Sequence, residues 1–230
     1  PSVVEALGRI EPRVTAAYAP IPGRPDFREA VRKDLLDEFG LTDIAANVAT
    51  PGGSGALRMA IDDFLDHGQT VLTSSYFWSP YRTLADEAGR TLTTFNMFGA
   101  DGRLDVAALD AAVTKVMADQ GRALLFLNTP KTGPVVVLVD VAYSYYAEEG
   151  LSVAVEALKP ALDELLVLFA WSASKSFAQY GLRVGSLVAV VPEADQRKRI
   201  ENAMTFSCRG LWSNCNAGGQ AAISNVLGDP

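Results

Sequence analysis

The feature that most constrains the fold is the apolar run Val135–Val139, which ends at a single carboxylate, Asp140. A strand that is apolar at consecutive positions is buried on both faces, as the central strands of mostly parallel sheets are. Other short apolar runs recur along the chain, and several are followed by a stretch with helical spacing of its apolar residues. This alternation is typical of α/β proteins. We therefore predict an α/β fold, a three-layer sandwich in which helices flank a central sheet.

The composition fits one α/β domain and excludes several functional classes. With 49% apolar and 20% charged residues, the 230-residue chain is globular rather than disordered. A net charge of −7 without a basic run argues against nucleic-acid binding. No apolar stretch approaches the roughly 18 residues of a membrane span. One histidine and two cysteines argue against a metal site and against a disulfide framework. With no secretory signal pattern at the start, we expect a cytoplasmic protein.

A small polar turn that carries one lysine follows the apolar stretch 165–170. The turn contains Ser172 and Lys175, and Arg183 comes eight residues after the lysine. A lysine on a short turn at the end of a strand can be desolvated, which lowers its pKa and makes its amine a nucleophile. The alternative from this turn alone is an ordinary solvated loop lysine.

A glycine-rich turn, Gly52–Gly55, lies between a predicted short strand and a predicted helix. Such a turn presents bare backbone N–H groups and the positive end of the helix dipole, which suits a phosphate. The Gly-Lys-Ser/Thr of a P-loop is absent, and so is the dinucleotide spacing. We therefore predict a phosphate site of another kind, although glycine-rich turns often have no chemical role.

Taken together, these segments resemble the fold-type I pyridoxal-phosphate enzymes, and among them the aspartate/aromatic aminotransferase family. The matching motifs, in chain order, are Gly-Gly-Ser-Gly-Ala-Leu-Arg (52–58), Asp-x-Ala-Tyr (140–143), Ser-x-Ser-Lys (172–175) and Arg-x-x-Trp-Ser-Asn (209–214). The resemblance covers nearly all of residues 15–230. It implies that residues 26–230 form the pyridoxal-phosphate-binding large domain, with a mostly parallel seven-stranded sheet. Residues 1–25 are proline-rich, and we expect them to be an irregular segment that leads into the domain.

The resemblance also implies which residues bind pyridoxal 5'-phosphate. Lys175 would carry the cofactor as a Schiff base and shuttle the substrate proton. Asp140 would pair with the ring nitrogen, Tyr143 would donate to the phenolic oxygen, and Trp78 would stack on the ring. The remaining matches would bind the phosphate: Gly53, Ser54, Gly55, Ser172, Arg183 and, from the neighbouring subunit, Tyr18. The alternative for Tyr18 is a turn tyrosine that packs locally.

Arg209 occupies the position at which aspartate-type members bind the side-chain carboxylate of a substrate in the partner's site. Because Tyr18 and Arg209 would both act across an interface, the resemblance implies a homodimer with shared active sites. The implied reaction is transamination between an amino acid, acidic or aromatic, and a 2-oxo acid. Two alternatives stay open. One is another reaction on the same cofactor, such as a β-lyase, and the other is a non-catalytic ligand-sensor domain.

One segment departs from the family pattern. The family has Asn-Pro-x-x-Asn-Pro-Thr-Gly and then a helix before the strand that ends in the aspartate. Here only the seven residues from Asn128 to Pro134 precede Val135. Two parallel neighbouring strands need a crossover of about a dozen residues or more. The sequence therefore predicts that residues are missing between Pro130 and Lys131, together with the family's asparagine for the phenolic oxygen.

Overall fold

The computed structural model describes residues 2–126, 135–146 and 151–228. These residues form one seven-stranded sheet with the strand order β1-β7-β6-β5-β4-β2-β3. Strand β7 runs antiparallel to both of its neighbours, and the other pairs are parallel. The mostly parallel seven-stranded sheet is therefore confirmed. The strands are β1 (Ala45–Pro51), β2 (Thr70–Ser74), β3 (Thr91–Phe95), β4 (Ala123–Phe126), β5 (Val135–Asp140), β6 (Leu166–Ser172) and β7 (Val184–Val190).

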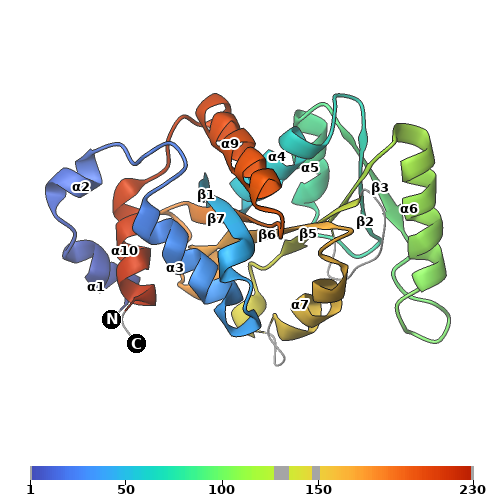
Figure 1. The fold of residues 1–230 in the computed structure, drawn as a ribbon, viewed down its shortest axis with the longest axis horizontal. Coiled ribbons are helices and arrows are strands. Elements are labelled where there is room, and N and C mark those ends of the chain that lie inside the picture. The colour runs from blue at the N-terminus through green and yellow to red at the C-terminus, as the bar shows by residue number, and fades with distance from the viewer. Residues whose placement is uncertain (1, 127–134, 147–150, 229–230) are drawn as a thin grey trace.

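Helices cover both faces of the sheet and complete three layers (Figure 1). One face packs against α4 (Gly52–Phe64), α5 (Pro80–Glu87) and α9 (Ala194–Leu211). The other face packs against α3 (Pro25–Leu36), α6 (Val106–Gln120), α7 (Ser152–Leu158) and α10 (Ala217–Leu227). Each face has its own apolar core, as expected for a sheet buried on both sides.

The central strand β5 shows why its sequence is continuously apolar. Val137 and Val139 pack into the core beneath α3 and α7, whereas Leu138 packs into the core beneath α4. Because side chains of a strand alternate between faces, both sets of positions must be apolar. The neighbouring β6 follows the same rule, with Phe169 and Leu168 on opposite faces. The prediction of a strand buried on both faces is confirmed.

The N-terminal segment differs from the irregular structure that we expected. It contains two short helices, α1 (Val3–Gly8) and α2 (Pro12–Ala16). Ser2 and Glu5 form a capping box on α1, and Pro12 occupies the first turn of α2, where a missing N–H costs little. Both helices lie against α10. The prolines therefore begin local structure here instead of preventing it.

The start of α3 also differs in detail. From the sequence, Asp26, followed three residues later by Glu29, is a candidate N-cap for this helix, but the helix begins at Pro25 and Asp26 lies in its first turn. Its carboxylate accepts from the backbone N–H of Phe27 and pairs with Arg24. The residues Pro130 and Lys131 lie outside the described residues, so the missing segment predicted between them stays a prediction.

The carboxyl ends of β2, β4, β5 and β6 meet at one edge of the sheet, since these strands are parallel. The antiparallel β7 begins at this same edge. Its register places Gly185 opposite Ser172 on β6 and Thr50 on β1, and Val184 opposite Pro51. The glycine turn, the lysine turn and Arg183 are therefore brought together by strand pairing.

Candidate active site

A cavity of about 570 Å³ opens at this edge of the sheet. Eight of the residues that the sequence singled out line it: Gly53, Ser54, Trp78, Asp140, Tyr143, Ser172, Lys175 and Arg183. They come from five separate segments of the chain, between residues 53 and 183. Apolar and aromatic side chains fill much of the remaining wall, among them Leu57, Phe77, Tyr81 and Phe126. A concave, largely apolar site with a few convergent polar groups is the usual form of a ligand site.

One end of the cavity is suited to an anion. The first turn of α4 lies there, and its N-cap position, Pro51, offers no side chain to the free backbone N–H groups. Gly53 lies against Ser172, because a Cβ at Gly53 would stand 3.2 Å from the Ser172 Cβ. The Ser172 hydroxyl accepts from the Ser174 N–H at 3.2 Å. Glycine thus leaves the backbone N–H groups open to a ligand at this end.

Arg183 completes the anion site from the start of β7. Its backbone is in the left-handed region, with φ of 52°, which costs a non-glycine residue about 1 kcal/mol or more. The guanidinium donates to the Ser174 hydroxyl at 3.2 Å and to the Tyr180 carbonyl at 3.0 Å. It occupies the space where a side chain at Gly52 would stand. The strained backbone therefore directs a fixed positive charge at the first turn of α4.

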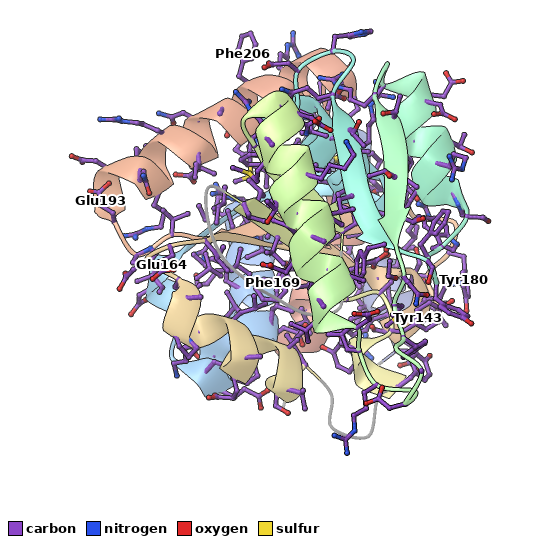
Figure 2. All side chains as sticks on the ribbon, turned by 90° about the vertical axis from the view of Figure 1, so that its right-hand side faces the viewer. Tyr143, Glu164, Phe169, Tyr180, Glu193 and Phe206 are labelled. Carbon is purple, nitrogen blue, oxygen red and sulfur yellow. The ribbon has the colours of Figure 1, made fainter. Side chains whose placement is uncertain are left out.

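Lys175 lies in the short helix α8 (Ala173–Ser176), directly after β6. Its Nζ stands 4.6 Å from the ring centre of Tyr180 and 5.6 Å from that of Tyr143, and Figure 2 shows both tyrosines on the same side of the molecule. The Tyr146 hydroxyl donates to the Lys175 carbonyl at 3.0 Å. Two electron-rich ring faces therefore hold the amine, and a third tyrosine holds its backbone.

Asp140 ends β5 and faces the cavity between two neutral donors. Its Oδ1 accepts from the Ala142 N–H at 3.1 Å, and its Oδ2 accepts from the Tyr81 hydroxyl at 2.9 Å. Burial raises the pKa of this carboxyl, while the Ala142 and Tyr81 hydrogen bonds lower it. Burial and the nearby carboxylate raise the pKa of Tyr81, so Tyr81 stays a donor at working pH.

The other predicted site residues take different places. Trp78 stands at the rim, half exposed, with its ring edge-on to Tyr81 at 5.8 Å. Gly55 is buried in the first turn of α4, where a Cβ would meet the ring of Pro51, and it does not line the cavity. Tyr18 is 91% exposed, and Arg209 is also exposed. Neither of these last two lines the cavity of its own chain.

Sequence reasoning missed three tyrosines of the site: Tyr81, Tyr146 and Tyr180. Tyr81 comes three residues after Trp78, in a group of aromatic residues that is more often core than site. Tyr146 follows Tyr143 by three residues, and Tyr180 follows Lys175 by five. The number of tyrosines near the Asp140 and Lys175 motifs was the available signal. Which groups these tyrosines contact is determined only by the fold.

A comparison with protein-family models shows the family to which the chain belongs. The model of the family "Aminotransferase class I and II" matches residues 1–133 and 131–230. The chain belongs to this aminotransferase family. The two matched segments meet within residues 127–134, where the sequence departs from the pattern of the aspartate/aromatic members.

Curated and solved class I and II aminotransferases are similar over most of the chain. An aromatic-amino-acid aminotransferase of Pseudomonas aeruginosa is 30% identical over 205 residues, which cover 78% of this chain and 50% of that protein. The aspartate aminotransferase of Escherichia coli is 27% identical and is matched over 95% of this chain and 61% of its own length. The crystal structure of an aminotransferase from Anaerococcus prevotii has a TM-score of 0.88 at 29% identity, covering 98% of this chain and 62% of that one. The chain thus spans about half to two thirds of these relatives.

Two further observations concern what the described residues contain. Among residues 2–126, 135–146 and 151–228, no helix has both the length and the apolar character for a membrane crossing. In the same residues, no three His, Cys, Asp or Glu side chains gather where they could hold a metal ion.

Proposed function

We propose that residues 26–230 are the cofactor-binding large domain of a pyridoxal-phosphate-dependent aminotransferase, with residues 1–25 as its N-terminal segment. The observation that carries this proposal is the convergence of Lys175, Asp140 and the anion site in one cavity. Class I and II aminotransferases use pyridoxal 5'-phosphate. The substrates are an amino acid, acidic or aromatic, and a 2-oxo acid.

The residues of the cavity fit this cofactor. A phosphate suits the α4 N–H groups opposite Arg183, where any side chain at Gly53 would fill the space. Asp140 suits a protonated ring nitrogen, because its buried carboxylate has only neutral donors. Trp78 at the rim offers a flat face for ring stacking. When bound, the cofactor supplies an electron sink for the bonds at the substrate Cα.

Each residue then has a defined task. Lys175 would hold the cofactor and, once its Nζ is released, that amine would take the proton from the substrate Cα and return it to the cofactor C4′ carbon. Asp140 would keep a proton on the ring nitrogen, and Tyr143 would donate to the phenolic oxygen. Arg183, Ser172, Ser54 and the N–H groups of the α4 turn, including that of Gly55, orient the phosphate. Arg183 binds with a planar fork that a lysine could not reproduce.

The test is to incubate the purified full-length protein with pyridoxal phosphate, a panel of amino acids and 2-oxoglutarate. A transaminase forms glutamate and the matching 2-oxo acid in equal amounts. Release of ammonia without glutamate would show a lyase, and absence of turnover with retained binding would show a ligand sensor. Lys175→Ala should abolish both turnover and the absorbance of lysine-bound cofactor, while the exposed Lys115→Ala should change neither. A cofactor adduct mapped to another lysine would contradict the assignment.

We also propose that Tyr18 and Arg209 act in the site of a second copy, so that the protein is a homodimer. The segments that carry these residues are connected through residues 213–214. The Asn214 side chain bonds both backbone groups of Ala19, next to Tyr18, and Arg209 donates to the Ser213 hydroxyl at 2.7 Å. Tyr18 and Arg209 are exposed and do not line the cavity of their own chain, which supports a role in a neighbour's site.

Mixed dimers test this proposal. Arg209→Leu should lower kcat/KM for an acidic substrate roughly ten- to hundredfold, the contribution of a charged hydrogen bond, and an aromatic substrate should lose little. Arg199→Leu, on the same helix, is the control. Mixing inactive Lys175→Ala with Arg209→Leu should then restore about a quarter of the wild-type sites, because each hybrid dimer contains one intact site. A monomer in sedimentation, or no recovery on mixing, would overturn the shared site.

We further propose a cytoplasmic location. Cys208 and Cys215 are free thiols, which is usual in a reducing compartment. Burial raises the pKa of each thiol to about 12, so neither has the thiolate character of a reactive cysteine.

A further inference from the structure

Tyr81 is a buried tyrosine whose ring is fixed from several sides. It lies in the first turn of α5 and is 9% exposed. Its ring meets Phe126 edge-on at 5.1 Å and Trp78 edge-on at 5.8 Å, and it stacks with Phe77 at 6.4 Å. An aromatic group packed in this way has little rotational freedom, so the position of its hydroxyl is determined by the core.

That hydroxyl reaches the carboxylate that lines the cavity. It donates to Asp140 Oδ2 at 2.9 Å, and the other oxygen takes the Ala142 N–H. Within the described residues, Asp140 forms no ion pair with a lysine, arginine or histidine. The other titratable groups that line the cavity are Tyr76, Tyr143, Lys175, Tyr180 and Arg183. Tyr81 is therefore the one side chain with a hydrogen bond to Asp140 in the described structure.

We propose that Tyr81 is a positioning residue that decides where a shared proton resides, on Asp140 or on the ring nitrogen of the cofactor. This inference rests on the proposed function. A carboxylate and a pyridine nitrogen that face each other share one proton, and the proton resides on the more basic partner. The Tyr81 hydrogen bond stabilises the ionised carboxylate and so makes it the weaker base. The proton then stays on the nitrogen, where it favours withdrawal of electrons from the substrate.

The chemistry of the donor matters as well. A phenol stabilises the carboxylate without bringing a charge, so the electrostatic attraction between Asp140 and the protonated ring is not weakened by a second cation. Burial raises the pKa of Tyr81, so the hydroxyl does not lose its proton as the pH rises. A lysine or histidine at this place would change charge or compete for the carboxylate. Tyr81 thus gives a constant hydrogen bond over the working pH range.

The test uses Tyr81→Phe in the full-length protein loaded with pyridoxal phosphate that carries ¹⁵N in its ring. The phenylalanine keeps the packing on Phe126 and removes only the hydroxyl. The ¹⁵N chemical shift reports directly whether the nitrogen is protonated. We expect a protonated nitrogen in the wild type and a shift toward the unprotonated form in Tyr81→Phe. With an amino-acid substrate, kcat should fall about tenfold or more, while KM changes little.

Two matched variants keep the result interpretable. Tyr145→Phe removes the same kind of tyrosine–carboxylate bond from Asp34, outside the cavity, and should leave the ¹⁵N shift unchanged. A ring-fluorinated tyrosine at position 81 keeps the hydroxyl as a stronger donor and should keep the nitrogen protonated. A protonated nitrogen in Tyr81→Phe, at wild-type shift, would overturn the inference and leave the proposed function intact. A wild-type protein that forms no lysine-bound cofactor would instead overturn the proposed function.

Discussion

Two aspartates near the lysine turn each accept a hydrogen bond from a tyrosine, yet only one of them lines the cavity. Asp140 is bonded by Tyr81 and lines the cavity. Asp34, on α3, is bonded by Tyr145 and also by the Trp171 indole N–H at 3.0 Å, and it does not line the cavity. Burial raises the pKa of both carboxyls. A tyrosine–aspartate hydrogen bond is therefore found both beside the cavity and away from it.

The two aspartates differ in their donors and in whether a cavity lies beside the carboxylate. Both oxygens of Asp34 take side-chain donors, one from the loop that carries Tyr143 and one from β6, just before Ser172. Asp34 thus joins two chain segments that form walls of the site. Asp140 has one side-chain donor and one backbone donor, and the cavity lies beside it. In this protein, Asp140 lies beside a cavity and is available to a ligand, whereas Asp34 links two segments of the chain.

The largest expected effect is a difference in catalytic activity between variants of these two aspartates. Asp140→Asn should lower kcat/KM on the order of 10²–10³-fold, because it removes a charge that is preorganised beside the proposed position of the cofactor ring. Asp34→Asn keeps an oxygen acceptor at a site outside the cavity, and its activity should stay within about fivefold of wild type. Steady-state kinetics on both variants measures the contrast. Equal losses would show that the cavity does not distinguish the two carboxylates.

A third buried carboxylate, that of Asp63 on α4, has no tyrosine and extends the comparison. It accepts a hydrogen bond from the Ser207 hydroxyl, while its Oδ2 has no partner. Burial raises the pKa of the Asp63 carboxyl to about 6. Because the folded state binds this proton more tightly, the carboxyl favours folding at about pH 4 and below, and this contribution is lost as the pH rises through about 6.

Asp63→Asn should therefore raise the free energy of unfolding at pH 7.5 by about 1–2 kcal/mol, because a neutral amide replaces a poorly partnered charge. The gain should disappear toward pH 4. Urea unfolding at a series of pH values measures it, with the exposed Asp110→Asn as the control. A variant that is less stable than wild type at pH 7.5 would show that a partner for the second oxygen exists in solution.

The smallest expected effect concerns the hydrogen bond between Tyr145 and Asp34. Tyr145→Phe should lower the free energy of unfolding by about 1 kcal/mol, because Asp34 loses one of its two donors while the ring keeps its contact with Phe177. Urea denaturation measures the change. If the variant lost catalytic activity at unchanged stability, Asp34 would belong to the site and not to the scaffold.

The sequence predicts those parts of the site that depend on local order along the chain. Lys175 follows a buried strand, Asp140 ends one, and the α4 turn is rich in glycine, so each has a local signal. The contact between Tyr81 and Asp140 joins residues 59 positions apart, and that between Tyr145 and Asp34 joins residues 111 apart. No periodicity encodes such pairs. The helices α1 and α2 do have local start signals in Ser2, Glu5 and Pro12, but both are short and pack against α10, far along the chain.

Two glycines beside the anion site have a consequence for how this protein could change. A Cβ at Gly185 would collide with the backbone of Gly52, and a Cβ at Gly52 would collide with the guanidinium of Arg183. An added methyl group at Gly185 would push the first turn of α4 away from β7, and one at Gly52 would displace the Arg183 guanidinium. The close approach of α4, β7 and Arg183 at the anion site therefore depends on the absence of a Cβ at Gly52 and Gly185. A mutation scan that ranks positions by charge or hydrogen-bonding capacity would pass over both glycines. Yet even alanine, the next larger residue, would clash at either position.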